Sequence, residues 1–563
     1  MNIYGAMNTA KWALLTQQAA IEVTGQNIAN VSNPDYTKQD IQLRASQPVS
    51  FGNHMIGSGV TIGGIERRFD SYLFGQRLQN NFDLSSWEAR ERVMDIMDIL
   101  LNETGDAGIN NDMGKLFQAF SNLGINPSNA VERQDVIQKG ISLTQNISTV
   151  AANLKRLRKD IDLKIQGVIP EINRITDEIV EMNIKIHESE VNGITANDFR
   201  DRREALLNDL ATFTDVTYFE QSNNEIVVML TNSRPLVIGQ QKFELSTNIN
   251  SSDPETSSIY WQDSSGGLTN ISTEFSGGQI GQWMTLRDND ILDVLDDLDL
   301  FSASIIKDVN RLHSSGYGLD GSTGNNFFNG LTPGGRAGVN NTGNGVLNPG
   351  TVTNPESVDL AHYRFTFDGA GNYTVYNRDD GSSMGTFSYT SGSPLTFFAD
   401  RGISISITGA PAAGDTFDIS ASNDAAVSMS MNSNVQTNTN RVAAGITTLR
   451  GDGAMANNIA DLQYLNRVGG TWDPTNAASG TYTFGDYFSS IVGGVGSSAL
   501  QARSGRALQE AVSNQLSNLR EQISGVSLDE EMINLVKFQH AYGGAAKVIT
   551  TVDEMLQTLL NMK

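Results

Sequence analysis

Histidines are the residues of this sequence that could most readily bind a metal ion or act as a catalytic base. The chain of 563 residues contains five of them and no cysteine. No two histidines stand at the spacing that would place two metal ligands on one helix face. The lack of cysteine excludes disulfides, thiolate zinc sites and a cysteine nucleophile. We therefore predict no metal site, no cofactor and five isolated structural histidines: His54, His187, His313, His362 and His540.

Two short segments partly match catalytic motifs. Residues 381–385, Gly-Ser-Ser-Met-Gly, fit the Gly-x-Ser-x-Gly pattern of serine hydrolases around Ser383. That motif needs a buried strand before the serine and a helix after it, whereas this segment lies in a turn-rich stretch. Gly-Lys-Leu at 114–116 lacks the other residues of a phosphate-binding loop. We therefore predict no catalytic residues and a protein that is not an enzyme.

Acidic residues outnumber basic ones, 63 to 39, and the net charge is −24. Most of the surface would repel nucleic acid and anionic membranes, so we expect neither as a partner. No run approaches the roughly 18 apolar residues of a membrane-spanning helix, and the N-terminal segment lacks the features of a cleavable signal. Aspartates on a predicted helix at 279–312 could be proposed as a cation site, but no loop supplies further oxygen ligands. We interpret them as a solvated helix face: Asp288, Asp293, Asp296, Asp297 and Asp299.

Both ends of the chain have the heptad spacing of amphipathic helices. The two apolar stripes can bury each other, which predicts a terminal coiled coil with everything between as an insertion. Closing helices of an ordinary globular bundle are the alternative interpretation. At the C-terminal end, Ser527 is a predicted N-cap and Glu530 its capping-box partner. The stripes are Ile3, Met7, Leu14, Ile21 and Ile28 at one end, and Leu528, Met532, Leu535, Tyr542, Ile549, Val552, Leu556 and Leu559 at the other.

The middle of the chain reads as helical body with β insertions, so the fold class is mainly α, an α+β multidomain protein. A long helix keeps heptad spacing over 143–186, with a kink or break expected at Pro170. Short turn-bounded segments predict β-hairpins at 216–275, and a Gly- and Asn-rich stretch at 329–357 predicts a linker or surface loop. A small antiparallel β-domain follows. The predicted segments are 1–58 (coiled coil and extended arm), 59–340 (helical body), 341–423 (inserted β-domain), 424–524 (second part of the helical body) and 525–563 (coiled coil).

The segment "NIANVSNPDYTKQ", residues 27–39, stops the first helix. Asparagine side chains compete with the helical hydrogen bonds, and Pro34 forbids helix for Asn33. Asp35 takes a turn position before an alternating strand. We therefore expect the chain to turn outward here into an extended arm.

This segment resembles the axial proteins of the bacterial flagellum, whose rod and hook members share an Asn-x-x-Asn-x-x-Thr/Asn-x-Gly-Tyr/Phe signature. Asn27, Asn30, Asn33 and Tyr36 match it, and "NDFRDRREALLNDLA", "GAPAAGDTFDIS" and "SGVSLDEEMINLVKFQHAY" add further similarity. Asp35 replaces the usual turn glycine, which a positive φ would permit. Gly543 and Gly544 stand where the family favours better helix formers.

The resemblance implies a secreted, extracellular structural adaptor at the junction of flagellar hook and filament, exported by the flagellar type III route. It implies assembly through the stripes and the asparagine motif. Its implied partners are the hook protein, a second junction protein, further copies in a ring, and an export chaperone on the C-terminal helices.

Three other functions stay open at this point. A hook or rod protein is expected to lack the long helical segment at 128–192. A secreted peptidoglycan hydrolase would need a carboxylate pair or a metal site in an added domain. An adhesin would bind a surface ligand through the β-domain.

Overall fold

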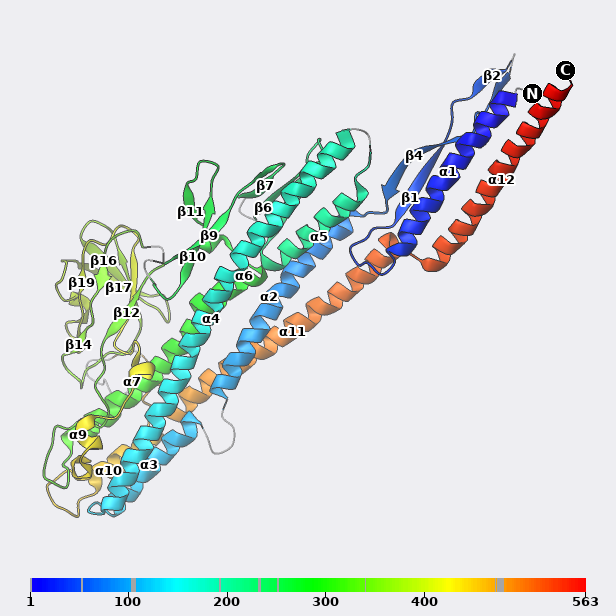
Figure 1. Ribbon diagram of the computed structural model, residues 1–563. Helices are drawn as coiled ribbons and strands as arrows, with labels where there is room; N and C mark the ends of the chain where they lie inside the picture. Colours follow the sequence, from blue (N-terminus) through cyan, green and yellow to red (C-terminus); the bar gives the residue numbers. More distant parts are fainter. Residues whose placement is uncertain are drawn as a thin grey trace.

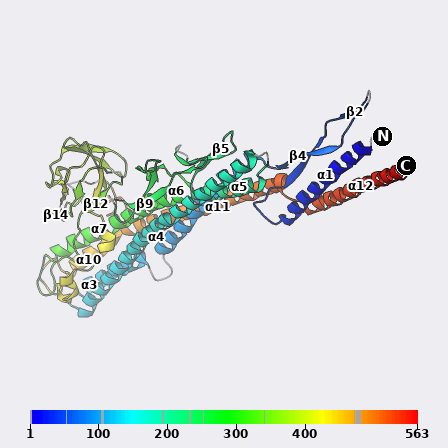
Figure 2. The same cartoon turned by 45° about the horizontal axis from the view of Figure 1, so that its top comes forward.

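The computed structural model describes residues 3–51, 54–102, 108–191, 194–230, 234–250, 253–339, 341–470, 472 and 480–562. The molecule is elongated, and the two ends of the chain lie together at one tip (Figure 1). A long helical body extends from this tip, and a β-domain stands beside the body near the opposite end in both views (Figures 1 and 2). The predicted class, mainly α with β insertions, is confirmed.

The tip consists of two helices and a β-arm. α1 (Ile3–Ala29) and α12 (Leu528–Asn561) lie side by side, so the chain ends pair. After α1 the chain forms a ribbon in which β1 (Gln39–Ala45) pairs with β4 (Val60–Arg67). The ribbon ends in a shorter hairpin of β2 (Val49–Phe51) and β3 (His54–Ile56).

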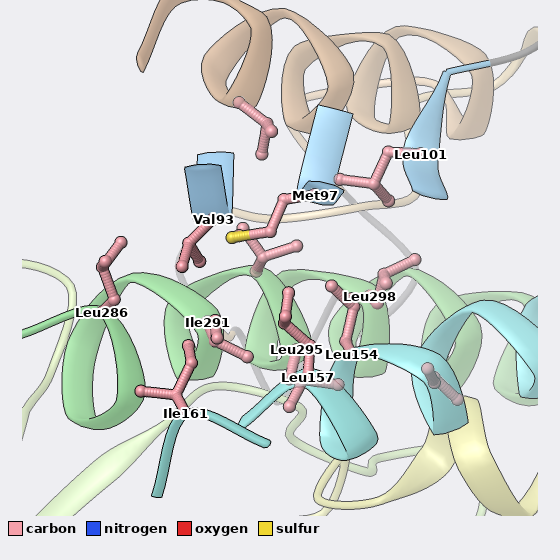
Figure 3. Packing of buried hydrophobic residues seen from close by; sticks show 14 of the residues in the cluster. Val93, Met97, Leu101, Leu154, Leu157, Ile161, Leu286, Ile291, Leu295 and Leu298 are labelled. Carbon is pink, nitrogen blue, oxygen red and sulfur yellow. The ribbon is translucent and has the colours of Figure 1, made fainter. Parts of the chain in front are cut away.

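Long helices form the body. α2 packs along α11, α4 packs against α3 and α5, and α6, η2 and α7 follow one another without a break. Apolar side chains of α2, α4 and α7 meet in one core, with Met97, Leu154 and Leu295 among them (Figure 3). The elements are α2 (Ser71–Leu101), α3 (Ile109–Ile125), α4 (Ala130–Val191), α5 (Asn197–Phe213), α6 (Gly278–Thr285), the π-helical turn η2 (Leu286–Asp290), α7 (Ile291–Ser315) and α11 (Phe484–Ser524).

α4 continues for 62 residues through Pro170, so of the predicted kink or break at this proline the break is wrong and the kink stays a prediction. Ile165, Ile169 and Ile172 are buried on either side of it, while the proline itself is exposed. A proline inside a helix costs about 3 kcal/mol. Each buried isoleucine contributes about 1.5–3 kcal/mol. Packing along the whole stripe therefore outweighs the one lost hydrogen bond.

Two small antiparallel sheets follow α5 and confirm the hairpins predicted for 216–275. The first has the order β5-β6-β7-β8 and the second β11-β10-β9. The strands are β5 (Val216–Glu220), β6 (Ile226–Leu230), β7 (Pro235–Ile238), β8 (Gln241–Lys242), β9 (Leu245–Ile249), β10 (Ser257–Gln262) and β11 (Leu268–Asn270), before the short turn η1 (Ser272–Glu274).

The β-domain has a five-stranded antiparallel sheet of order β12-β20-β15-β16-β17 and two short strand pairs, β13 with β19 and β14 with β18. Its apolar residues form a core separate from that of the body. The elements are β12 (Gly334–Ala337), β13 (Val346–Leu347), β14 (Thr351–Val352), β15 (Tyr363–Phe367), β16 (Asn372–Asn377), β17 (Ser383–Ser388), η3 (Thr396–Phe398), β18 (Ile403–Ser404), β19 (Ile407–Thr408) and β20 (Thr416–Ser420).

The predicted linker at 329–357 is wrong, because β12, β13 and β14 lie within it. Side chains hold this Gly-rich stretch to the sheet. The carboxylate of Asp415 accepts hydrogen bonds from the N–H groups of Thr342 (2.8 Å) and Gly343 (3.0 Å). β12 also precedes the predicted start of the β-domain at 341; the other predicted limits of the segments stay predictions.

Helix does not return fully at 424. Short turns and helices come first, and the long helix resumes only with α11, after Thr483. The short elements are α8 (Ala425–Ser428), α9 (Ser433–Gln436), η4 (Thr439–Arg441), α10 (Ala454–Ala460) and η5 (Asp461–Tyr464).

The interpretation of the five aspartates as a solvated helix face holds for Asp293, which is exposed, but is wrong for Asp296 and Asp299; Asp288 and Asp297 are half-buried. Asp296 and Asp299 are only 8 % and 6 % exposed. Asp296 pairs with Arg336 and Arg378 of the β-domain, and Asp299 accepts backbone N–H groups from the start of α8. These partners lie far along the chain, so no local pattern revealed them.

Candidate functional site

Asn27 lies at the centre of a buried polar network where the tip meets the body, and only 1 % of it is exposed. Its Nδ2 donates to the carbonyl of Gln39 (2.9 Å) and to Oε2 of Glu531 (3.0 Å). Its Oδ1 accepts hydrogen bonds from the hydroxyl of Tyr36 (2.8 Å) and the N–H of Gln39 (3.1 Å). One amide thus joins α1, the start of the arm and α12.

The other two asparagines of the motif act locally. Nδ2 of Asn30 donates to the carbonyl of Gln26 (3.0 Å), one turn back in α1. Oδ1 of Asn33 accepts the N–H of Asp35 (3.1 Å), which makes an Asx turn. The expected positive φ at Asp35 is wrong: among the described non-glycine residues, only Asn224 and Asp424 have one. The side chain of Asn33 closes this turn, so it needs no left-handed residue.

Lys38 ties the arm to α12. Its Nζ lies 2.9 Å from Oε1 of Glu531 and 3.1 Å from Oε2 of Glu530, and its side chain is 4 % exposed. Burial by itself lowers the pKa of Lys38, but hydrogen bonds to Glu531 and Glu530 raise this pKa overall. Ser527 caps α12 as predicted by accepting the N–H of Glu530. The carboxylate of Glu530 binds Lys38, in place of its predicted capping-box role.

A second group of charges ties the arm to α5. Arg67, at the end of β4, pairs with Asp201 (2.5 Å) and Glu204 (2.7 Å), and Asp201 also accepts the N–H of Thr37 (3.0 Å). Burial raises the pKa of Asp201 and of Glu204, and the nearby Arg67 offsets only part of that rise. Arg67 therefore counteracts part of the effect of burial on both carboxylates.

The end of α11 completes the connection. Nη2 of Arg520 donates to the carbonyl of Tyr36 (3.0 Å), and the N–H of Lys38 donates to the carbonyl of Ser524 (2.9 Å). Burial and neighbouring carboxylates raise the pKa of Tyr36, so its hydroxyl stays protonated and donates to Asn27. We call this network the joint: Asn27, Tyr36, Lys38, Gln39, Arg67, Asp201, Glu204, Arg520 and Glu531. A buried network of this kind is stable only when all its members are paired, so it specifies one orientation of tip and body.

The predicted apolar stripes lie along the facing sides of α1 and α12 only in part. Val552 is buried, at 6 % exposed, while Leu14, Ile21, Ile28, Leu535, Ile549 and Leu556 are half-buried. Met7, Leu528, Met532, Tyr542 and Leu559 are 37–58 % exposed. The side chain of Ile3 lies outside the described part. The pair of helices therefore leaves much of its apolar surface uncovered.

Sequence reasoning found Asn27 and Tyr36 but missed most of their partners. Lys38 and Gln39 stand in the quoted motif, next to the residues that were singled out. Asp201 and Arg67 lie about 170 and 40 residues away from Asn27 in the sequence, and no local spacing links them. The signal that could have pointed to these partners is the cluster of charges in "NDFRDRREALLNDLA", because the apolar spacing that makes this segment a helix does not require these charged residues.

The residues considered for catalysis lie apart from one another. His313 is fully buried: its Nδ1 lies 2.6 Å from the carbonyl of Asn325, and its Nε2 accepts the N–H of Ala443 (2.9 Å). His362 contacts the hydroxyl of Ser422 (3.3 Å), while His187 and His540 lie at the surface. Ser383 begins β17 and is exposed, so it is not on a strand-to-helix elbow. The side chain of His54 lies outside the described part.

Neither a metal site nor a membrane-spanning helix is present among the residues that the structure describes. No group of three or more histidine, aspartate or glutamate side chains there could hold a metal ion. No helix in this part of the chain is long and apolar enough to cross a membrane.

Comparison with protein families gives three matches. Residues 94–328 match the helical domain of flagellar hook-associated protein FlgK, and residues 337–421 match a D2-like domain of flagellar hook-associated protein 1. Residues 521–562 match the C-terminal domain of flagellar basal body rod FlgEFG proteins.

Relatives extend over the whole chain. Flagellar hook-associated protein 1 of Escherichia coli K12 is 26 % identical over 565 residues, covering 99 % of both chains. The protein of the same name from Bacillus subtilis 168 is 24 % identical and covers 99 % of this chain and 97 % of its own. The solved structure of the flagellar hook junction protein FlgK from Burkholderia pseudomallei has the same fold, with a TM-score of 0.67 at 17 % identity over 80 % of this chain and all of its own. The chain belongs to the family of flagellar hook-associated protein 1.

Proposed function

We propose that this chain is a structural subunit of the flagellar hook–filament junction, assembled through α1 and α12. The observation that carries the proposal is the contrast in surface along the molecule. Most large apolar side chains of the body are buried, whereas the paired terminal helices expose Met532, Ile533 and Leu560 at 58 %, 68 % and 74 %. Exposed apolar stripes of this extent are typical of assembly surfaces.

The joint supports the same proposal. A subunit that connects two tubes must hold its terminal helices at a fixed angle to the body, because neighbouring copies repeat that angle. The ion pairs of Arg67 with Asp201 and Glu204 of α5, and the hydrogen bond from Arg520 of α11 to the carbonyl of Tyr36, support a fixed angle between the terminal helices and the body. The tip can then present the same surface in every copy.

We further propose the finer details that the family suggests. The partners are the hook protein, a second junction protein, other copies in a ring, and an export chaperone that covers the C-terminal helices before assembly. The protein acts outside the cell as part of the flagellum, after type III export, and performs no catalysis. Its lack of cysteine suits passage through a narrow channel in the unfolded state, because no disulfide can form on the way.

A deletion strain tests the function directly. We expect hooks to be present and filaments absent, with flagellin released into the medium, when flagella are imaged by negative-stain electron microscopy. Expression of the full chain from a plasmid should restore filaments. Hooks missing altogether would point to a hook or rod protein instead.

A further inference from the structure

The helix that α6 and α7 form together is interrupted by the π-helical turn η2. There the N–H of Ile291 bonds to the carbonyl of Leu286, five residues back, where an α-helix would use the carbonyl of Arg287. The turn therefore carries one residue more than the α-helix on either side of it needs. Turns of this kind are among the few places at which helices bend sharply.

α4, which packs against η2, has a weak stretch of its own beside this turn. Gly167 is exposed, a Cβ atom added there would meet nothing within 4 Å, and its φ is not in the left-handed region. Pro170 lacks the N–H that would continue the hydrogen bonds of the helix. Both residues lie within about 12 Å, along α4, of Asp162, which bonds to η2. Two neighbouring helices thus have a place at which they can bend, at nearly the same level of the body.

Two buried arginines hold the turn in its present form. Nε of Arg158, on α4, donates to the carbonyl of Arg287 (3.0 Å), the group that the π turn leaves out of the α-helical pattern. Nη1 of Arg287 donates in turn to Oδ1 of Asp162 (2.5 Å), one turn further along α4. All three side chains are buried. A buried group of charges is stable only while every member is paired, so we call Arg158, Asp162 and Arg287 the lock.

The outer side of the turn has room for movement. A hollow of about 300 Å³ lies there, between Thr285 and Asn289 on one side and Asn270 and Thr273 of the neighbouring small sheet on the other. Closely packed interiors resist bending, because every shift brings atoms into contact. A hollow beside η2 removes this resistance on one side.

We propose that η2 is a bending point of the body, and that the lock must open for the body to bend. The inference rests on the proposed function, because a subunit between two tubes is loaded along its body whenever either tube bends. α6 lies nearer the tip and α7 nearer the opposite end (Figure 1), and α7 binds the β-domain through Asp296. A bend at η2 therefore changes the angle between the tip and the part of the body that carries the β-domain.

Hydrogen exchange of the full chain tests the proposal without any assembly. We expect the amides of residues 287–292 to exchange faster than those of α6 and of the rest of α7, because each bending event opens the turn. Equal protection along this helix would overturn the proposal.

Removal of the extra residue separates a bending point from a turn that is needed only for packing. Asn289 is exposed, and its deletion restores a continuous α-helix while the residues on either side keep their places. We expect exchange of the turn to slow by about tenfold and the melting temperature to stay equal or rise. If the extra residue were needed to align α6 with α7, the deletion would lower the melting temperature, and this result would overturn the proposal.

A variant of the lock should have the opposite effect. Arg158→Met removes the donor to the carbonyl of Arg287, so exchange in η2 should become about tenfold faster, the effect of one lost buried hydrogen bond. Arg156→Met is the matched control, because Arg156 is exposed on the same helix and bonds to Asn153, one turn back. It should leave exchange in η2 unchanged, and equal effects of the two variants would overturn the role of the lock.

Cells that lack the native chain show whether the bending point matters in the flagellum. The chain without Asn289 should assemble filaments in normal number, since α1 and α12 are unchanged. It should lose them more readily than the unmodified chain when the cells are sheared, as counted by electron microscopy before and after shearing. Equal retention would overturn the proposal and leave the proposed function intact. Failure of the unmodified chain to restore filaments would count against the proposed function instead.

Discussion

The β-domain and the tip, at opposite ends of the molecule, treat apolar side chains in opposite ways. In the β-domain, Phe365, Tyr373 and Ile419 are fully buried in a core of its own. At the tip, two paired helices leave Ile533 and Leu560 mostly exposed. The β-domain completes its core within one chain, while the tip leaves apolar surface that the proposed assembly would cover.

At this end of the molecule polar side chains are buried, in contrast to the exposed apolar ones. The joint below the exposed helices buries Asn27, Lys38 and Glu531 almost completely and pairs each of them. The apolar contacts of the tip are non-directional, so they stabilise an assembly without defining its angle. Hydrogen bonds are directional, and the joint therefore supplies the orientation that the apolar helices lack.

The largest effect is expected where a charge is placed on the tip. Leu556→Asp puts a carboxylate on the half-buried side of α12, where it would be desolvated without a partner in the assembled tube, at a cost of several kcal/mol per subunit. Cells with this variant should have hooks without filaments and should not swim, although the melting temperature of the body stays the same. Motility plates and electron microscopy measure this.

Met384→Asp is the matched control in the β-domain, because Met384 is 38 % exposed on the edge strand β17. It should leave assembly and swimming normal. A Leu556→Asp strain that swims as well as the Met384→Asp strain would show that the two ends do not differ in the way described.

A smaller effect is expected at the joint. Asn27→Ala leaves the carboxylate of Glu531 and the hydroxyl of Tyr36 without one of their partners in a buried site, at a cost of about 2–4 kcal/mol. Hydrogen exchange should speed up in α1 and α12, while α4 keeps its protection. Limited proteolysis should then trim both chain ends more quickly and leave the body intact.

Asn30→Ala serves as the control, because among the described residues the side chain of Asn30 bonds to the carbonyl of Gln26, one turn back in α1, and not to α12. It should change exchange in α12 by an amount within error. Equal deprotection of α12 in the two variants would contradict a special role of Asn27.

A third effect distinguishes the body from the tip, because it makes the stability of the body depend on pH. Burial lowers the pKa of His313 to about 4 from the ordinary value of 6.5. As the pH falls below 6.5, His313 binds a proton in the unfolded chain but stays neutral in the folded body. The stability that neutral His313 allows is therefore complete above pH 6.5 and declines progressively towards pH 4. The loss amounts to about 3 kcal/mol at most, from roughly 1.4 kcal/mol per pKa unit.

The His313→Asn variant should flatten the dependence of unfolding free energy on pH in this interval by up to one proton. Urea unfolding followed at several pH values measures it. His187→Asn controls for the replacement of a histidine by asparagine at a side chain that is 37 % exposed. If His313→Asn kept the full dependence of unfolding free energy on pH, the acid sensitivity would come from other groups.

The smallest effect is expected in the β-domain. Ser383→Ala alters an exposed residue at the start of an edge strand, so unfolding free energy should change by less than about 0.5 kcal/mol. Filament assembly should be unaffected. Any loss of a hydrolytic activity in this variant would contradict the structural interpretation of the Gly-x-Ser-x-Gly segment.

Local patterns in the sequence predicted what is determined locally. The end of α1 after Ile28, the cap at Ser527 and the hairpins after α5 all follow from neighbouring residues. Pro170 misled because its cost is local while the compensating burial of Ile165 and Ile172 extends along the whole of α4. At Pro170 the low helix propensity of proline opposes the packing of the neighbouring isoleucines, and the structure shows that packing prevails.

Long-range partners of polar side chains could not be predicted, although the pairing of the two terminal helices could. The aspartates of α7 read as a solvated face because Arg336 and Arg378, which cover Asp296, lie 40 and 82 residues further on. The joint shows the same limit: Asn27 was found through its motif, but its partner Glu531, and Asp201 as the partner of Thr37 and Arg67, are brought there only by the fold. The charge and polarity of side chains in the sequence indicate which residues need partners, but they do not indicate which residues those partners are.

The contact between Asn27 and Glu531 spans 504 residues, nearly the whole chain. A polypeptide that emerges from its N-terminus cannot form this contact until the last forty residues or so have also emerged. The β-domain can fold earlier, because the strands of its main sheet all lie between Gly334 and Ser420, whereas the body also needs α11, which packs along α2. A chain that stops before Leu528 has no α12 to meet α1, so the paired tip forms only in a subunit whose synthesis has passed this point.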